Sequence, residues 1–160
     1  MKSVTIATSV LVLIGAASIT VAQAAESETH KLVTPQEVVW SVAPPALPKR
    51  AELAVLYGDP SKEGPFVMRL KVPSNYHIAT HMHPTPELVT VISGTFKLGM
   101  GDDEDKSKTQ ALPAGSFFAL APDTPHFAYT DEETVLQIST NGPWGLKYVN
   151  PNDDPRQNTQ

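Results

Sequence analysis

Hydrophobic and polar residues alternate over short runs along most of this chain. In the clearest run, residues 66–72, every second side chain from Phe66 is large and apolar, whereas Arg69 and Lys71 lie between them. An alternation of period two predicts a strand with one buried face. Similar runs, separated by turn-forming residues, lie at 53–57, 76–83, 88–93, 95–100, 116–120, 127–130, 134–140 and 146–149. Runs that recur about every 8–12 residues predict an all-β sandwich or barrel.

The first 24 residues have a different pattern from the rest of the chain. Lys2 precedes an apolar run at 10–17, and Ala22-Gln23-Ala24 provides the small residues of a cleavage site. This pattern predicts a secretory signal peptide that is cleaved after Ala24, and hence a periplasmic or secreted protein. An uncleaved membrane anchor is the alternative, although the apolar run is short for one. After cleavage we expect no membrane association, because no later run is long enough to span a bilayer.

The remaining residues divide into three segments. Residues 25–50 are a leader and edge segment, whose prolines at 44–48 favour an extended chain over a helix. Residues 51–150 hold the strand-like runs and form the predicted β-barrel, and residues 151–160 are a polar tail. A chain of 160 residues has room for one such domain.

Composition excludes several classes of function. The formal net charge is −5, which argues against a nucleic-acid partner, since that requires a basic surface. The chain contains no cysteine, so disulfides, thiol nucleophiles, Cys-ligated zinc and iron–sulfur clusters are excluded. The acidic stretch at 101–108 lacks the glycine and the later glutamate of a calcium loop, and we interpret it as a solvated hairpin tip.

Residues 76–87 hold the most informative group of side chains. On a strand, His81 and His83 point to the same face, where two imidazoles can share one metal ion. Pro84 and Pro86 exclude a helix here, so the chain turns and a second strand begins at Glu87. If the second strand pairs alongside the first, this carboxylate reaches the same ion. Two histidines and a carboxylate suit a divalent transition metal.

The spacing of these residues resembles the first motif of the cupin superfamily. The two histidines, the glutamate and the following glycine of that motif correspond to His81, His83, Glu87 and Gly94. Asn75 replaces the initial glycine of the motif, and asparagine also tolerates a left-handed backbone.

A later segment resembles the second cupin motif. Gly115 and His126 match it. Ala121, Asp123 and Thr130 replace a proline, a glycine and an asparagine. These departures affect the shape of a turn and a structural hydrogen bond rather than the metal ligand.

The resemblance spans about residues 66–140 and implies a fold, a cofactor and an oligomer. The implied fold is all-β, the cupin-type double-stranded β-helix or jelly-roll barrel. The implied cofactor is one divalent transition metal (Fe, Mn, Ni or Zn), with His81, His83, Glu87 and His126 as ligands. The chain also looks like small exported cupins of one domain and like the cupin modules of anti-sigma factors. A homodimer is implied as well, to which a strand from residues 36–42 could contribute.

Three residues near the implied site have two interpretations each. His77 shares strand parity with His81 if no bulge intervenes, and could then act as a proton shuttle beside the metal, or it could face water. Gln137, between two apolar residues, could point inward toward substrate or outward to solvent. Trp144 could close the barrel mouth or pack on a neighbouring subunit.

The predicted signal peptide and the resemblance together imply an exported metal-binding cupin whose partner is a small molecule. We expect a metalloenzyme of dioxygenase, isomerase or lyase type, because such a ligand set leaves metal positions open for substrate or O₂. Glu87 could leave the metal and act as a base. The alternative is a non-catalytic periplasmic cupin that binds or senses a ligand or metal. A structural barrel with an empty site is a third interpretation.

Overall fold

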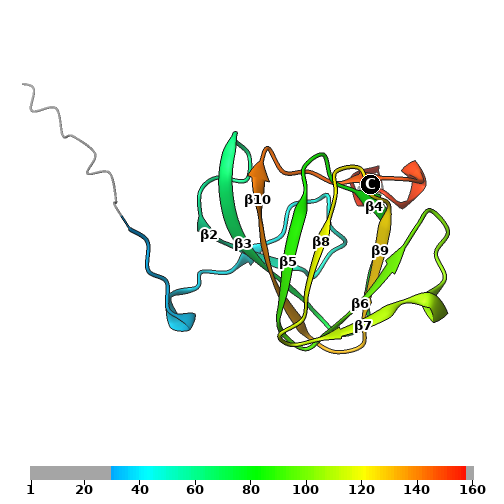
Figure 1. Cartoon of the computed structure of the whole chain (residues 1–160), viewed down its shortest axis with the longest axis horizontal. Coiled ribbons are helices and arrows are strands. Elements are labelled where there is room, and N and C mark those ends of the chain that lie inside the picture. The colour runs from blue at the N-terminus through cyan, green and yellow to red at the C-terminus, as the bar shows by residue number, and fades with distance from the viewer. Residues whose placement is uncertain (1–29, 158–160) are drawn as a thin grey trace, which may run out of the picture. The chain divides into compact units, whose positions relative to one another are not determined.

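Two antiparallel β-sheets form the body of the protein (Figure 1). The computed structural model describes residues 30–157, so the predicted signal peptide lies outside the described residues. The strands of this part are β1 (Ser41–Val42), β2 (Glu52–Tyr57), β3 (Gly64–Val72), β4 (Tyr76–Met82), β5 (Glu87–Ser93), β6 (Thr95–Met100), β7 (Gln110–Pro113), β8 (Phe117–Leu120), β9 (His126–Thr130), β10 (Thr134–Gly142) and β11 (Lys147–Tyr148). Its 3₁₀ helices are η1 (Pro35–Glu37), η2 (Lys106–Lys108), η3 (Pro151–Asp153) and η4 (Pro155–Gln157).

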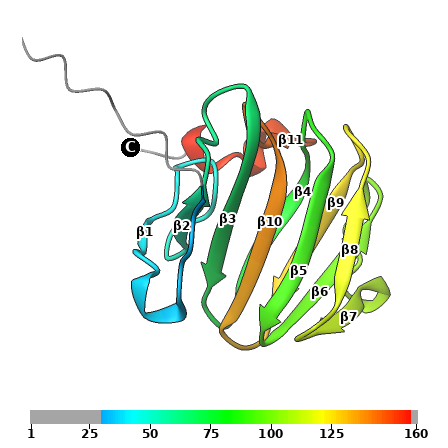
Figure 2. The same ribbon diagram turned by 60° about the vertical axis from the view of Figure 1, so that its left-hand side comes forward.

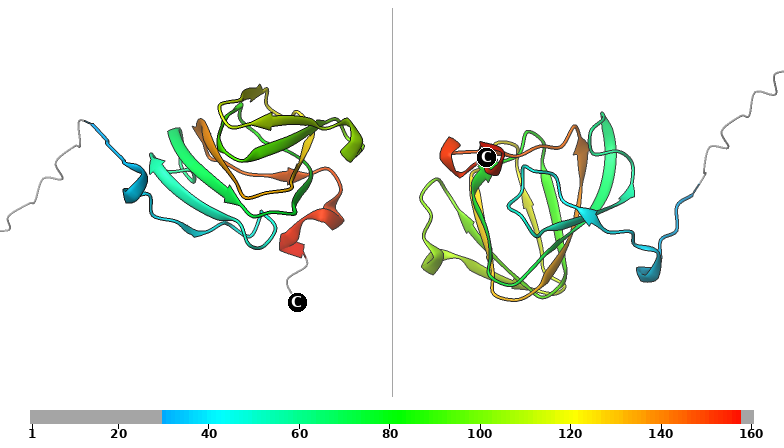
Figure 3. Two further views of the ribbon diagram at one scale, coloured as in Figure 1. Left: turned by 90° about the horizontal axis from the view of Figure 1, so that it is seen from below. Right: turned by 180° about the vertical axis from the view of Figure 1, so that it is seen from behind.

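The sheets face each other and enclose the core between them. The six-stranded sheet has the order β1-β2-β3-β10-β5-β8, and the five-stranded sheet has the order β11-β4-β9-β6-β7. Figure 2 shows the first sheet in front of the second, and Figure 3 shows the two layers from other directions. Consecutive strands often lie in different sheets, as β3 and β4 do, which gives the double-stranded β-helix predicted from the sequence.

The alternating runs correspond to strands in the structure. In β3 every second side chain, namely Phe66, Met68, Leu70 and Val72, is at most 3% exposed, because these side chains point between the sheets. Strand β7 was not predicted, since its four residues end in Pro113 and show little alternation. Of the predicted edge segment 36–42, only Ser41–Val42 is a strand, and it pairs with β2 of the same chain.

Three of the four replaced motif positions keep their structural tasks. Asn75 and Asp123 both adopt a left-handed backbone, with φ of 53° and 55°, as the glycines of the motifs would. The Thr130 hydroxyl donates a hydrogen bond to the Pro73 carbonyl at 2.8 Å, which ties the end of β9 to the turn before β4. Both left-handed positions of the two motifs are therefore retained without glycine.

No helix within residues 30–157 is both long enough and apolar enough to cross a membrane. The 3₁₀ helices each span three residues and bury none of them, so the core is built by the strands together with loop residues such as Leu47 and Leu146.

Candidate metal centre

A cavity lies between the two sheets and is largely apolar. It encloses about 30 Å³, which is room for a metal ion or about two water molecules. The lining residues are Leu47, Leu70, Ile78, His81, His83, Glu87, Val89, Phe96, Phe118, His126, Leu136, Ile138, Trp144 and Leu146.

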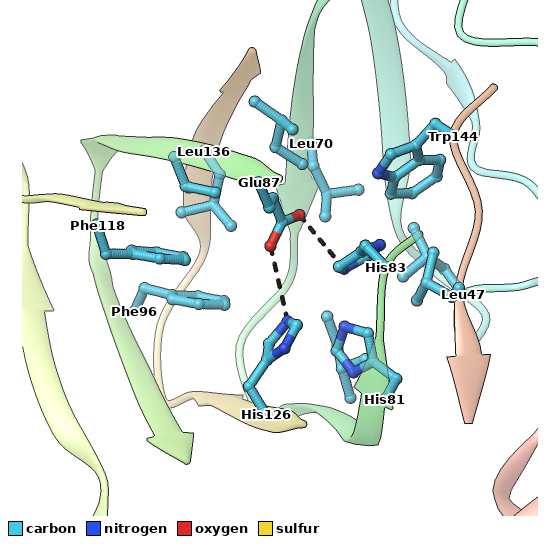
Figure 4. A pocket seen from close by; sticks show the side chains of 14 residues that line it. Leu47, Leu70, His81, His83, Glu87, Phe96, Phe118, His126, Leu136 and Trp144 are labelled. Atoms are coloured by element: carbon cyan, nitrogen blue, oxygen red, sulfur yellow. Dashed lines mark ion pairs between the residues drawn. The ribbon is translucent and has the colours of Figure 1, made fainter. Parts of the chain in front are cut away.

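Four of these side chains converge in the cavity, and we call them the inner cluster: His81, His83, Glu87 and His126 (Figure 4). They come from the end of β4, the turn after it and the first residues of β5 and β9. One ring nitrogen from each histidine lies within 4.8 Å of one from each of the others. All four residues are 3–6% exposed. The structure therefore brings together the four predicted ligands.

Strand pairing explains why residues far apart in sequence meet here. In the pairing of β4 with β9, His81 lies opposite His126, and their ring centroids are 4.2 Å apart. The proline-containing turn after β4 carries the chain to the facing sheet, where Glu87 begins β5. Its carboxylate lies 3.4 Å from His83 Nε2 and 3.6 Å from His126 Nε2.

Backbone carbonyls orient the three imidazoles. The Nδ1 atoms of His81, His83 and His126 lie 2.8, 2.8 and 2.9 Å from the carbonyl oxygens of Ala79, Gly145 and Thr124. A carbonyl oxygen only accepts hydrogen bonds, so each Nδ1 carries a proton and donates it. In a neutral ring the lone pair is then on Nε2, which is the arrangement that a metal ligand requires.

Burial keeps these rings neutral. Desolvation lowers the pKa of His83 to about 4, against the opposing hydrogen bond to Gly145. Desolvation also lowers the pKa of His81 well below its ordinary value, and that of His126 in the same direction. At neutral pH the three rings therefore present uncharged nitrogens.

Glu87 and the imidazoles beside it face one another with hydrogen-bond acceptors only. Burial raises the pKa of this carboxyl group to about 7, with His126 acting in the opposite direction. The ionised carboxylate and the neutral Nε2 atoms beside it are all acceptors, so they repel one another unless a proton or a cation lies between them. Three imidazoles and a carboxylate with this shortage of donors fit a divalent transition metal.

His77 lies outside the cavity, and a β-bulge is the reason. Between Ile78 and His81 the register of β4 against β9 shifts, because three steps on β4 match two on β9. The extra residue reverses the side-chain parity, so the condition for His77 to share a face with His81 is not met, and the structure supports the interpretation in which His77 faces outward. The His77 side chain is 44% exposed.

His77 belongs to a second group of side chains, the outer cluster: His77, Thr80, Glu104 and Tyr129. The Glu104 carboxylate accepts a hydrogen bond from the Thr80 backbone N–H at 2.6 Å and lies 2.8 Å from His77 Nε2. The Tyr129 ring stacks on His77, with 4.4 Å between centroids and 6° between planes. The acidic loop is thus not wholly a solvated tip, because Glu104 folds back against the barrel.

Gln137 also lies away from the inner cluster. Its neighbours Leu136 and Ile138 line the cavity, so strand alternation turns Gln137 to the outer face of its sheet. There its side-chain oxygen accepts a hydrogen bond from Arg69 at 3.3 Å. Of the two interpretations of Gln137, the structure supports the outward one.

Trp144 also lines the cavity, and the sequence left two interpretations of it open, closure of the barrel mouth and packing on a neighbouring subunit. It lies between β10 and β11, and its ring stacks on His83 with 5.6 Å between centroids and 18° between planes. The signal for this position was weak, since it consisted of one tryptophan in a Gly-Pro-Trp-Gly turn. The contact supports closure of the cavity within this chain.

Comparison with solved structures shows the fold. The polyketide cyclase RemF from Streptomyces resistomycificus shares 16% identity and a TM-score of 0.66, covering 80% of this chain and 91% of that one. A candidate acetylacetone dioxygenase from Methylibium petroleiphilum PM1 shares 19% identity and a TM-score of 0.61, over 79% and 85%. An RmlC-like cupin from Shewanella frigidimarina shares 12% identity and a TM-score of 0.55, over 71% and 91%.

Comparison with sequence families gives the assignment. No curated protein matches the chain. The model of one family, described as a domain of unknown function (DUF4437), matches residues 23–147 and so includes all four members of the inner cluster. With its two antiparallel sheets and its cupin neighbours, the chain is a cupin-fold protein that belongs to the DUF4437 family.

Proposed function

We propose that this protein is an exported metalloenzyme that binds one divalent transition metal, Fe, Mn, Ni or Zn, and acts on a small organic molecule. The observation that carries the proposal is the inner cluster itself, in which three neutral imidazoles and a carboxylate meet in a cavity with otherwise mostly apolar walls. His81, His83, Glu87 and His126 would hold the metal. When bound, it would supply Lewis-acid or O₂-dependent chemistry.

Glu87 is the residue best suited to move a proton in this cavity. A carboxyl group with a pKa of about 7 can accept or release a proton at neutral pH, which is the requirement for general acid–base catalysis. The apolar walls lower the dielectric constant around it, which strengthens its electrostatic interactions. We therefore propose Glu87 as both ligand and base, and we propose no catalytic role for His77 or Gln137.

The structural neighbours suggest a substrate class to test. Two of them are named for a polyketide and for acetylacetone. Both names describe carbonyl compounds, and a carbonyl oxygen is a group that a divalent metal polarises. We propose a compact carbonyl compound as substrate, with dioxygenase, isomerase or lyase chemistry as the reaction types.

The first experiment is metal analysis of protein exported with its own first 24 residues and purified without chelator. We expect a mass that shows cleavage after Ala24, and near-stoichiometric metal in wild type and in the outer-cluster control H77A. The double variant H83A/H126A should lose the metal. Protein that takes up none of the four metals, even on reconstitution, contradicts the proposal.

The second step tests turnover of the metal form obtained. With iron we expect O₂ uptake in the presence of acetylacetone or a related diketone. With manganese, nickel or zinc we expect isomerisation or bond cleavage without O₂, followed by proton NMR. The variant E87Q should lose turnover in either case.

One observation favours a second candidate, a non-catalytic periplasmic cupin that binds or senses a ligand. The cavity encloses about 30 Å³, and outside the inner cluster none of its described lining side chains is an acid or base. A metal-loaded protein that holds a diketone and returns it unchanged would support this candidate over the enzyme.

We also propose that the protein forms a homodimer. Leu88, Ile92 and Phe117 are 40%, 40% and 59% exposed on the outer face of β5 and β8, where a second copy could cover them. Sedimentation analysis of the wild type and the variant F117E tests this, because a charge at the centre of that face should yield monomers. A wild type that sediments as a monomer contradicts it.

A further inference from the structure

Trp144 carries a hydrogen-bond donor that the protein leaves unused. Among the buried side-chain nitrogen and oxygen atoms of the described residues, its indole Nε1 is the one without a hydrogen-bond partner. Buried polar groups in native proteins nearly always have a partner, so an exception calls for an explanation. The explanation depends on what the indole N–H faces.

The indole is held in place at the cavity wall. The Trp144 backbone N–H donates to the Pro60 carbonyl at 2.7 Å, and the carbonyl of the next residue, Gly145, accepts from His83 Nδ1 at 2.8 Å. The ring is stacked on His83. Figure 4 shows the indole nitrogen on the side of the ring that faces the cavity. The free donor therefore has a defined position beside a candidate metal ligand.

The other walls of the cavity offer no comparable group. Apart from the inner cluster and Trp144, the described side chains that line it are Leu, Ile, Val and Phe. The lone pairs of the inner cluster would be directed at the metal. A ligand at an open metal position would thus meet hydrocarbon on most sides and one N–H donor.

We infer that Trp144 donates a hydrogen bond from Nε1 to an oxygen of a compact ligand bound beside the metal. The site then selects molecules with two oxygen atoms close together, one for the metal and one for the indole. Small carboxylates and dicarbonyl compounds meet this requirement. This inference rests on the proposed metal site and specifies its ligand class.

Formate, the smallest carboxylate, is a suitable probe. In Zn²⁺-loaded protein with ¹⁵N-labelled indoles, the chain gives two indole N–H signals, from Trp40 and Trp144. The variant W40F assigns them. We expect the Trp144 proton to move downfield as formate is added and the Trp40 proton to stay unchanged. A Trp144 signal that does not respond overturns the inference, whether or not formate binds.

The variant W144F tests the same contact by affinity. Phenylalanine keeps a ring against His83 but lacks the N–H. In the Co²⁺ form, monitored by visible absorption, we expect formate to bind about tenfold more weakly to W144F than to wild type or W40F. Cobalt affinity should be the same in all three proteins. Equal formate affinity in wild type and W144F overturns the inference.

The metal titration distinguishes a failure of the proposed metal site from a failure of the inferred ligand class. If neither Zn²⁺ nor Co²⁺ binds, the proposed function fails and this inference fails with it. If the metals bind and the Trp144 indole signal does not shift with formate, the proposed metal site stands and the ligand class inferred from Trp144 is wrong.

Discussion

Strand β4 carries one histidine of each of two clusters, which lie on opposite sides of its sheet. The two clusters differ in whether the protein supplies hydrogen-bond donors to their carboxylates. The outer cluster is complete within the protein. Its carboxylate, Glu104, receives the Thr80 N–H, lies against the His77 ring and accepts from the Tyr129 hydroxyl at 3.3 Å. The inner cluster is deeply buried, and its carboxylate faces ring nitrogens that offer lone pairs rather than protons.

The difference shows that residue type alone does not mark a site. Both clusters contain histidine and glutamate, and both include residues of β4 and β9. What distinguishes the inner cluster is that every Nδ1 is already used on a backbone carbonyl, while desolvation removes the positive charge that would pair with Glu87. Such a group needs a proton or a cation between its acceptors, whereas the outer cluster has donors of its own.

The largest expected effect is on metal affinity, which should depend on the inner cluster and not on the outer one. Replacing His126 with alanine removes one nitrogen ligand, and even losses of groups that support a ligand cost about 10–100-fold in affinity. We expect the dissociation constant for Zn²⁺ to rise by about 100-fold or more in H126A, measured by competition with a chromophoric chelator.

The matched variant is H77A, which removes an imidazole from the outer face of the same sheet. Its zinc affinity should equal that of wild type, because its ring lies outside the cavity. Comparable losses in H77A and H126A would contradict the assignment of the metal to the inner cluster.

The second effect concerns stability. A metal that binds the folded state alone, at a free concentration one hundred times its dissociation constant, adds about 2.7 kcal/mol to the free energy of unfolding. We expect this gain in wild type and H77A and its absence in H126A, measured by urea unfolding with and without Zn²⁺. A gain retained by H126A would place the metal elsewhere.

The third prediction sharpens the comparison between the two carboxylates. At a pH above 7, metal-free protein holds an ionised Glu87 beside two acceptor nitrogens. The side-chain amide of E87Q removes the charge and donates to one of them. We expect E87Q to stabilise the metal-free protein by about 1–2 kcal/mol and to weaken metal binding, measured by urea unfolding and zinc titration. A destabilised E87Q would mean that the inner cluster is already satisfied.

Much of the fold followed from local pattern. The alternating run at 66–72 became β3 because one face of each strand must be buried between two sheets, a constraint that appears directly in the sequence. The pair His81 and His83, with Glu87 after a proline turn, was placed by the same period-two geometry. Strand β7 was missed because four residues carry too little alternation to be distinguished from a loop.

At the site, the features that the sequence did not predict have one physical cause: each depends on a tertiary contact. The bulge in β4 arises from its pairing with β9 and leaves no mark on the sequence, so the parity of His77 could not be read across it. Glu104 was assigned to solvent because its acidic neighbours are exposed, and its bond to Thr80 joins residues 24 positions apart. The role of Trp144 depends on its stacking against His83, which lies in the turn after β4.

The smallest effect tests the outer cluster by pH. Burial raises the pKa of Glu104, but the Thr80 N–H and the His77 ring lower it by more, so that its net pKa lies below the ordinary value of 4.5. A carboxylate whose pKa falls on folding contributes stability that is present above pH 4.5 and is lost as the pH falls through the folded value. The variant E104Q, which keeps an acceptor for Thr80, should therefore cost about 1 kcal/mol at neutral pH and nothing in strong acid.

The measurement is the difference in unfolding free energy between wild type and E104Q from neutral to acidic pH, by urea unfolding. The control D103N removes one negative charge from the exposed part of the same loop, and its difference from wild type should stay small throughout. A loss of unfolding free energy in E104Q that does not change with pH would show that packing of the Glu104 side chain, rather than its charge, stabilises the outer cluster. The opposite signs expected for E87Q and E104Q above pH 7 then form the direct test of the comparison, since both variants replace a glutamate beside a histidine and differ in whether protein donors surround it.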